Sequence, residues 1–288
     1  MKDMKILALL TSIAMLLMLG CSNQTFFFAF SWNHLLFIWA CILLTNDDVW
    51  QAGLALEGSE TATLQGVVNK TSMLAALAVG GGMGGIWLTQ NYPALSWPLG
   101  ILGFIAVIVV YFVIMSNPLR AKQTAWIYAI VEGAFLGVLT YMLDGVLENM
   151  GFEATGGLAL QAFVVTISVL ISMLALYYFK ILKPTKKFTA VVSVLTVGIF
   201  LTYLISFGMS FFGAEMPFLS LGSAMQGGQA AWIGIGINVL ILGVASLWLI
   251  IDFGMVEQHV NAGAPKQMEW FCGFILMVTL VWIYLEAV

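Results

Sequence analysis

Long apolar runs dominate the chain and recur along most of its length. Each reaches the roughly 20 residues that an α-helix needs to cross a bilayer. None alternates apolar and polar residues with the period of two that membrane β-strands show. The pattern predicts an all-α membrane protein in which residues 70–288 form a bundle of seven transmembrane helices. Counted back from the C-terminus, the runs are 268–287, 230–252, 188–212, 156–179, 123–145, 94–115 and 71–89.

The first 50 residues allow three interpretations. They open with a basic start, an apolar run and a Gly-Cys pair, as a secretory or lipoprotein signal does. A second run, 25–44, is long enough to span a membrane, so the two runs could instead form a transmembrane hairpin. A translation start assigned too early is the third interpretation. We therefore expect one or two extra N-terminal hydrophobic segments, followed by an acidic, polar cytoplasmic linker at 51–69.

Basic residues occupy alternate loops of the predicted bundle. Eight Lys and Arg residues lie at position 70 and in the loops 116–122, 180–187 and 253–267. The intervening loops, 90–93, 146–155 and 213–229, contain none. Cytoplasmic loops of membrane proteins carry the excess of Lys and Arg. The pattern predicts that residue 70 lies on the cytoplasmic side and that the C-terminus lies outside.

Composition supports a membrane location and excludes several other classes. Only 8% of the 288 residues are charged and 61% are hydrophobic, whereas soluble domains carry roughly 25% charged residues. The net charge of −4 argues against nucleic acid as a partner. The three cysteines lack the paired spacing of a disulfide framework or zinc site. No arrangement of Ser, Cys and His suggests a hydrolase, so we expect a protein that is not an enzyme and has no cofactor.

Two acids fall inside predicted helices, where a charged group costs several kcal/mol and marks a candidate functional site. Glu132 lies about 13 Å into its helix. It is either a proton- or cation-sensitive acid or a protonated side chain that holds the packing. Asp252 is expected about one turn inside the cytoplasmic face, where Gly254 would let the helix loosen. It is either a gate or cation ligand, or a boundary acid paired with Lys266.

Three further features have more ordinary interpretations. Glu257 and Glu269 flank the last loop as interfacial charges, and Glu269 also suits the start of a helix because of the helix dipole. The glycine run 79–85 lacks the ending of a phosphate-binding loop. It is expected to serve close helix packing, as are Gly133 and Gly137 at their spacing of four.

The C-terminal stretch IIDFGMVEQHVNAGAPKQMEWFCGFILMVTLVWIYLE closely resembles the end of bacterial Bax inhibitor family proteins, in particular the YccA-like branch. LQGVVNKTSMLAALAV and YAIVEGAFLG resemble the same branch and occur in the same order. The resemblance covers about residues 64–288. It implies a seven-helix bundle in a bacterial inner membrane and membership of a group associated with pH-gated calcium leak.

The resemblance also implies a site and shows two departures from it. In the family pattern, two aspartates from the last two helices form a pH-sensing pair, and Asp252 matches the first. The second falls at about Thr279, and Gly254 stands where the branch usually has another acid. Without a second carboxylate, a shared-proton dyad is not available. Thr279 is expected at a depth similar to that of Glu132, so those two side chains could form a replacement polar centre.

Two functions follow as expectations. The first is a passive cation pathway, for calcium, that responds to protons through Asp252, Glu132, Thr279, Glu257 and Glu269. Oxygen ligands suit calcium, and so few of them predict weak, partly hydrated binding. The second is a non-transporting protein that binds and regulates another membrane protein, such as a protease or stress factor. Its support is the glycine-rich helix faces and the absence of a second aspartate.

Overall fold

The computed structural model describes residues 60–149, 151, 156–210 and 229–288. The N-terminal hydrophobic segments, most of the predicted linker and most of the loop 213–229 therefore lie outside the described residues. Within the described part, seven helices are long and apolar enough to cross a membrane, as predicted. Two short 3₁₀ helices, η1 (Pro93–Leu95) and η2 (Pro118–Arg120), precede the second and third. The seven are α4 (Leu64–Asn91), α5 (Ser96–Ser116), α6 (Ala121–Asn149), α7 (Leu158–Tyr178), α8 (Lys186–Ser210), α10 (Gln229–Asn261) and α11 (Met268–Ala287).

The main difference from the predicted boundaries is at the end of α10. This helix does not loosen at Gly254 but continues to Asn261. It stops where Gly263 adopts a left-handed conformation with φ of 81°. The amides of Gly263 and Ala264 then bond back to the carbonyl groups of Val260 and His259, which is the Schellman arrangement. Asp252 consequently lies well inside a continuous helix rather than near its end.

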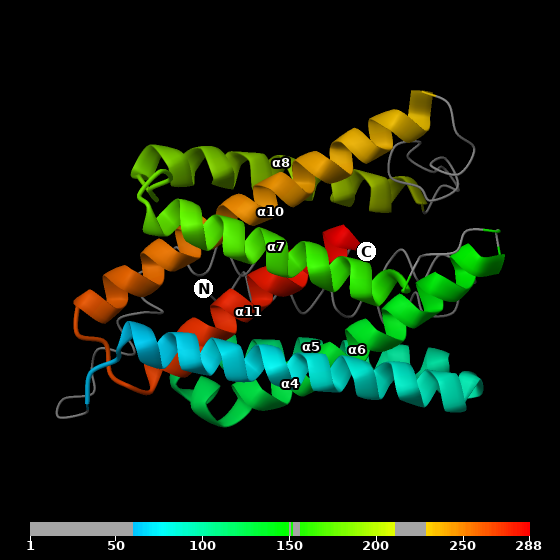
Figure 1. The fold of residues 1–288 in the computed structure, drawn as a ribbon, viewed down its shortest axis with the longest axis horizontal. Helices are drawn as coiled ribbons and strands as arrows, with labels where there is room; N and C mark the ends of the chain where they lie inside the picture. Colours follow the sequence, from blue (N-terminus) through cyan, green and yellow to red (C-terminus); the bar gives the residue numbers. More distant parts are fainter. Residues whose placement is uncertain (1–59, 150, 152–155, 211–228) are drawn as a thin grey trace.

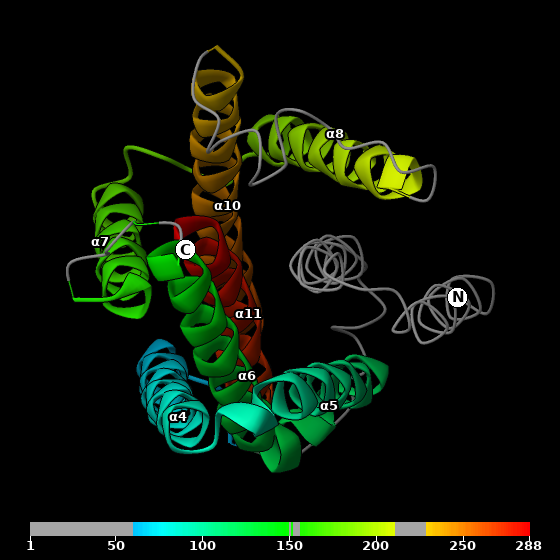
Figure 2. The ribbon, with the colours of Figure 1, turned by 90° about the vertical axis from the view of Figure 1, so that its right-hand side faces the viewer.

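The last helix, α11, is the centre of the bundle. It contacts α4, α6, α7 and α10, and Figure 2 shows it surrounded by these elements. Three of its aromatic side chains, Phe271, Phe274 and Trp282, are buried. By contrast, α8 lies at the periphery (Figure 2) and exposes a row of large apolar residues. That difference fits an environment in which peripheral helices contact lipid.

Helices α4 and α6 approach closely enough for their backbones to touch. A Cβ atom added to Gly133 or Gly137 of α6 would overlap a backbone carbonyl of α4. The reverse holds for Gly81 and Gly85 of α4, which face carbonyl groups of α6. Small residues permit this approach between membrane helices. The predicted packing role is thereby confirmed for Gly81 and Gly85 of the glycine run and for the Gly133–Gly137 pair.

One end of the bundle gathers the connections that carry the basic residues. In Figure 1 the start of α4, the α7–α8 connection, the end of α10 and the start of α11 all lie at the left-hand end. The turn between α5 and α6 lies at the same end. We call this end the basic end. It holds Lys70, Arg120, Lys122, Lys180, Lys183, Lys186, Lys187 and Lys266.

Candidate functional site

A buried polar contact joins the last two long helices. Asp252 of α10 and Thr279 of α11 are both almost fully buried. The Thr279 hydroxyl donates a hydrogen bond of 2.5 Å to Oδ2 of Asp252. The packing of α10 against α11 brings together these two positions, which lie 27 residues apart in the chain. A carboxyl group is therefore held in the bundle core by one neutral donor.

Three polar side chains lie at similar depth from the basic end. Asp252 precedes the end of α10 by nine residues, or about 14 Å of helix. Thr279 and Glu132 each follow the start of their helix by eleven residues, or about 17 Å. They therefore form a layer at roughly half the depth of a 30 Å hydrocarbon core.

Glu132 is fully buried, yet it does not share in the contact between Asp252 and Thr279. The Tyr128 phenol, one turn earlier on α6, interacts with it electrostatically. Neither Glu132 carboxyl oxygen, however, reaches hydrogen-bond geometry with any partner among the described residues. The predicted centre of Glu132 and Thr279 is thus wrong in its pairing, because packing directs the Thr279 hydroxyl to Asp252.

The α7–α8 connection covers α10 on the basic side of Asp252. The ring of Pro184 occupies the place where a side chain at Gly254 would lie. Tyr177 donates a hydrogen bond to Glu257, and its ring packs on Phe253 with centroids 5.6 Å apart. Glu257 is thus a partner of α7 and not only an interfacial charge. The structure also gives a steric reason for glycine at position 254.

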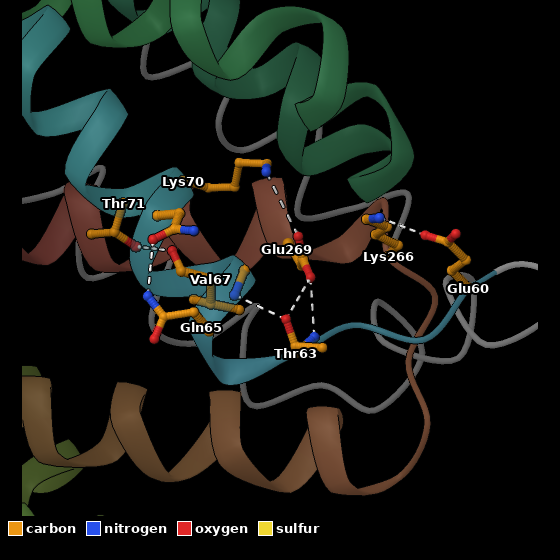
Figure 3. A network of polar contacts seen from close by, with 10 residues as sticks. Glu60, Thr63, Gln65, Val67, Lys70, Thr71, Lys266 and Glu269 are labelled. Atoms are coloured by element: carbon orange, nitrogen blue, oxygen red, sulfur yellow. Dashed lines mark hydrogen bonds and ion pairs between the residues drawn. The ribbon is translucent and has the colours of Figure 1, made fainter.

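Lys266 does not pair with Asp252, which corrects that alternative. Its ammonium group instead lies 2.5 Å from the Glu60 carboxylate. This ion pair lies outside the helices, lowers the pKa of Glu60 and raises the pKa of Lys266 through their hydrogen bond. Both side chains are solvent-exposed, and Figure 3 shows them beside the α10–α11 loop.

The start of α4 meets the α10–α11 loop at a junction. On the other side of this junction, Glu269 lies against the first turn of α4. Its carboxylate accepts hydrogen bonds from the backbone N–H of Thr63, at 3.0 Å, and from the Thr63 hydroxyl, at 3.2 Å (Figure 3). The Thr63 hydroxyl also accepts a bond from the amide of Gly66 and so caps α4. Lys70 completes the cluster with its ammonium group 3.8 Å from Glu269. A carboxylate at a helix N-terminus is stabilised by the helix dipole.

Backbone contacts strengthen the same junction. Thr61 and Pro265 form an isolated β-bridge. The amide of Ala62 donates to the Ala264 carbonyl, and the amide of Lys266 donates to the Glu60 carbonyl. The start of α4 is therefore fastened to the loop before α11. Sequence reasoning missed this junction, although Thr63 immediately before an apolar run is a usual helix-capping signal.

The described residues offer few ligands for a metal ion. They contain no group of three or more His, Cys, Asp or Glu side chains that could hold one. Asp252 and Thr279 together supply at most three side-chain oxygens, whereas calcium takes six to eight. A calcium ion at this contact would have to take most of its ligands from water.

The seven apolar helices around a buried polar layer define a multi-pass integral membrane protein. Residues 42–288 match the family model described as Bax inhibitor 1 like. That match covers most of the chain, so the protein belongs to the Bax inhibitor 1 like family. The match begins ahead of residue 64, where the sequence motifs first resembled the family. No curated protein and no solved structure matched the chain in the other two comparisons.

Proposed function

We propose that this protein is a pH-sensitive cation leak of a bacterial inner membrane, with calcium as the ion. In this proposal it acts as a pathway and not as an enzyme, and the Asp252–Thr279 contact responds to protons. Membership of the Bax inhibitor 1 like family supports a membrane role of this kind. The particular branch, YccA-like, remains a prediction from the sequence motifs.

The observation that carries the proposal is a buried carboxyl bonded to a single neutral donor. An ionised carboxylate deep in a bilayer is costly unless it is paired or hydrated. Among the described residues, Asp252 receives one hydrogen bond, from Thr279. Losing the Asp252 proton would therefore favour the entry of water or a cation. Holding the proton would favour the closed packing of α10 on α11.

Threonine in place of the family's second aspartate changes the expected response. Two close carboxylates share protons and titrate in two coupled steps. A hydroxyl can donate to the ionised carboxylate and can accept from the protonated one. The Asp252–Thr279 contact can thus persist in both states. We expect a response that follows a single proton.

The test is calcium entry into liposomes that contain the purified protein, measured over a series of pH values. Asp252→Asn removes the titrating group and keeps the shape of the side chain, so the flux should lose its pH dependence. Asp144→Asn is the matched control, because Asp144 lies only part-buried towards the other end of α6 and should leave the profile unchanged. An absence of flux from the wild-type protein, or an unchanged profile in Asp252→Asn, would overturn the proposal.

One observation favours the second candidate, a protein that binds and regulates another membrane protein. Ala76, Gly80 and Gly84 are exposed at a spacing of four along α4. A Cβ added to Gly80 or Gly84 would meet nothing. Such a stripe permits close approach of a helix from another protein.

This candidate is tested by recovering the protein from native membranes and identifying what accompanies it. The Gly80→Leu/Gly84→Leu variant would block the stripe, and Gly198→Leu on the peripheral α8, where a Cβ also meets nothing, is the control. A stoichiometric partner lost only in the first variant would support this function. Recovery of the protein alone would count against it.

A further inference from the structure

The connection between α7 and α8 is the most densely charged stretch of the basic end. Lys180, Lys183, Lys186 and Lys187 fall within eight residues, and no acid lies among them. All four side chains are exposed. The ion pairs formed among the described residues are those of Lys70 with Glu269 and Lys266 with Glu60. The four positive charges are therefore not neutralised by a carboxylate of the described chain.

This connection has a fixed backbone. The amides of residues 179–182 bond back to carbonyl groups in the last turn of α7. Lys180 reverses the chain in a left-handed conformation with φ of 57°. Pro184 lies against Gly254 of α10, and the Thr185 hydroxyl accepts a hydrogen bond from the amide of Phe188 at the start of α8. The lysines thus extend from a pre-organised support, which lowers the entropy lost when a ligand binds.

Large apolar side chains border the lysines. Tyr178, Phe179 and Ile181 have 77%, 69% and 67% of their surface exposed. They continue the apolar outer surface of α7, which includes Ile171 and Leu174. Aromatic residues at the end of a transmembrane helix lie at the headgroup level. The four lysines lie among and directly after these apolar side chains in the chain.

We propose that residues 178–187 form a binding surface for anionic phospholipid headgroups, with the apolar side chains in the bilayer interface and the lysines on the phosphates. The positive-inside rule accounts for the sign of the charge. It does not account for an exposed aromatic and aliphatic border on a hydrogen-bonded turn. Two other lysines of the basic end, Lys70 and Lys266, are already paired with carboxylates. The proposal is independent of cation conduction.

The test compares lipid binding to the full-length protein in two variants that each remove two charges from the same end. Lys183→Gln/Lys186→Gln alters the proposed surface, and Arg120→Gln/Lys122→Gln alters the α5–α6 turn as the control. The probes are phosphatidylglycerol and phosphatidylcholine, and the readout is the amount of each lipid retained in native mass spectrometry. Both variants are first checked for a single species by size-exclusion chromatography.

We expect the wild-type protein and the control to retain phosphatidylglycerol in preference to phosphatidylcholine. Each lysine near an anionic surface contributes roughly fivefold to binding, so the Lys183→Gln/Lys186→Gln variant should lose about 25-fold of the preference. The preference should also weaken as salt is added. Equal loss in both variants, no loss in either, or displacement of the lipid by millimolar inorganic phosphate would overturn the proposal.

A second variant examines the apolar border separately. Phe179→Ser/Ile181→Ser keeps all four charges and removes the anchoring side chains. It should lower the retention of both lipids without changing their ratio, whereas the lysine variant changes the ratio. An unchanged retention of both lipids would contradict the placement of these side chains in the interface.

Discussion

Among the described residues, Thr279 alone donates a hydrogen bond to the Asp252 carboxyl. Thr279→Val keeps the shape of the side chain but removes the donor, so it leaves a buried carboxyl unsatisfied. Such a loss costs about 1–3 kcal/mol. We expect a lower thermal unfolding temperature in detergent for Thr279→Val and a value near the wild type for Thr279→Ser. Equal unfolding temperatures for the two variants would mean that the hydroxyl does not stabilise the core.

Glu132 presents the opposite situation, because its carboxyl is buried without a hydrogen bond to any described residue. Glu132→Met fills a similar volume and removes the unsatisfied polar group. Replacing such a group is expected to be neutral or to stabilise the fold by about 1 kcal/mol. Unfolding of the two proteins in the same detergent measures the difference. A clear loss of stability would show that Glu132 holds the packing, through its interaction with Tyr128.

The liposome assay then distinguishes the two interpretations of Glu132. If Glu132 is retained for function at a cost in stability, Glu132→Met should be at least as stable as the wild type. The pH dependence of its calcium flux should differ from that of the wild type. A residue with neither effect would be a tolerated core acid. Asp252 differs from Glu132 in that a hydrogen bond from Thr279 fixes its place in the packing.

At the scale of elements, Gly254 lets the α7–α8 connection rest directly on α10. Gly254→Ala places a methyl group against the Pro184 ring, which forces the connection outward. Overpacking of this kind costs about 1–3 kcal/mol. We expect lower stability and faster calcium entry, because the cover on the basic side of Asp252 is displaced. Gly243→Ala on the same helix meets nothing and should change neither quantity.

The junction between α4 and the α10–α11 loop makes a prediction about pH. The pair with Lys266 lowers the Glu60 pKa from 4.5 and raises the Lys266 pKa from 10.5. The Glu60 contribution is present above pH 4.5 and is lost as the pH falls through the lowered pKa. The Lys266 contribution is present below pH 10.5 and is lost as the pH rises through the raised pKa.

Between about pH 5 and pH 10 the contribution of this pair is therefore constant. We expect unfolding curves of the wild type and Lys266→Gln to differ by the same small amount across this range and to converge below it. A difference that changed near neutral pH would contradict the assignment. A pH response of the protein near neutrality must accordingly come from groups other than this pair.

The helices could be predicted from the sequence where local properties determine them, and not where a particular backbone conformation does. The seven spans could be predicted because the length and apolar character of each run are local properties. The close packing of α4 on α6 through glycines could also be predicted, from the spacing of Gly133 and Gly137. The end of α10 was not, because its stop depends on the left-handed Gly263 and not on Gly254.

The site was only partly readable for a similar reason. Asp252, Glu132 and Thr279 could be singled out as polar residues in apolar helices. Their pairing could not, because it depends on how α10 and α6 are rotated against α11. The central position of α11 could not be predicted either, because its sequence is no more apolar than that of the peripheral α8. The two helices differ in their neighbours.

At the scale of the whole molecule, the distribution of charge predicts how the bundle crosses the membrane. Lys183 lies at the basic end and Tyr92 at the other, and both are exposed. In a variant without native cysteines, Tyr92→Cys should react with a membrane-impermeant maleimide in intact cells. Lys183→Cys should react only after permeabilisation, because basic loops remain cytoplasmic. The reverse pattern of labelling would show the opposite orientation.

The central position of α11 has a consequence for biosynthesis. Ribosomes release the chain from its N-terminus, so α11 leaves the insertion machinery after the six other described membrane helices. Until then, the faces of α4, α6, α7 and α10 that contact α11 lack the helix that covers them in the finished bundle. The carboxyl of Asp252 on α10 likewise gains its hydrogen bond from Thr279 only when α11 is in place. Completion of the described bundle therefore depends on the insertion of α11, after the six other described helices have entered the membrane.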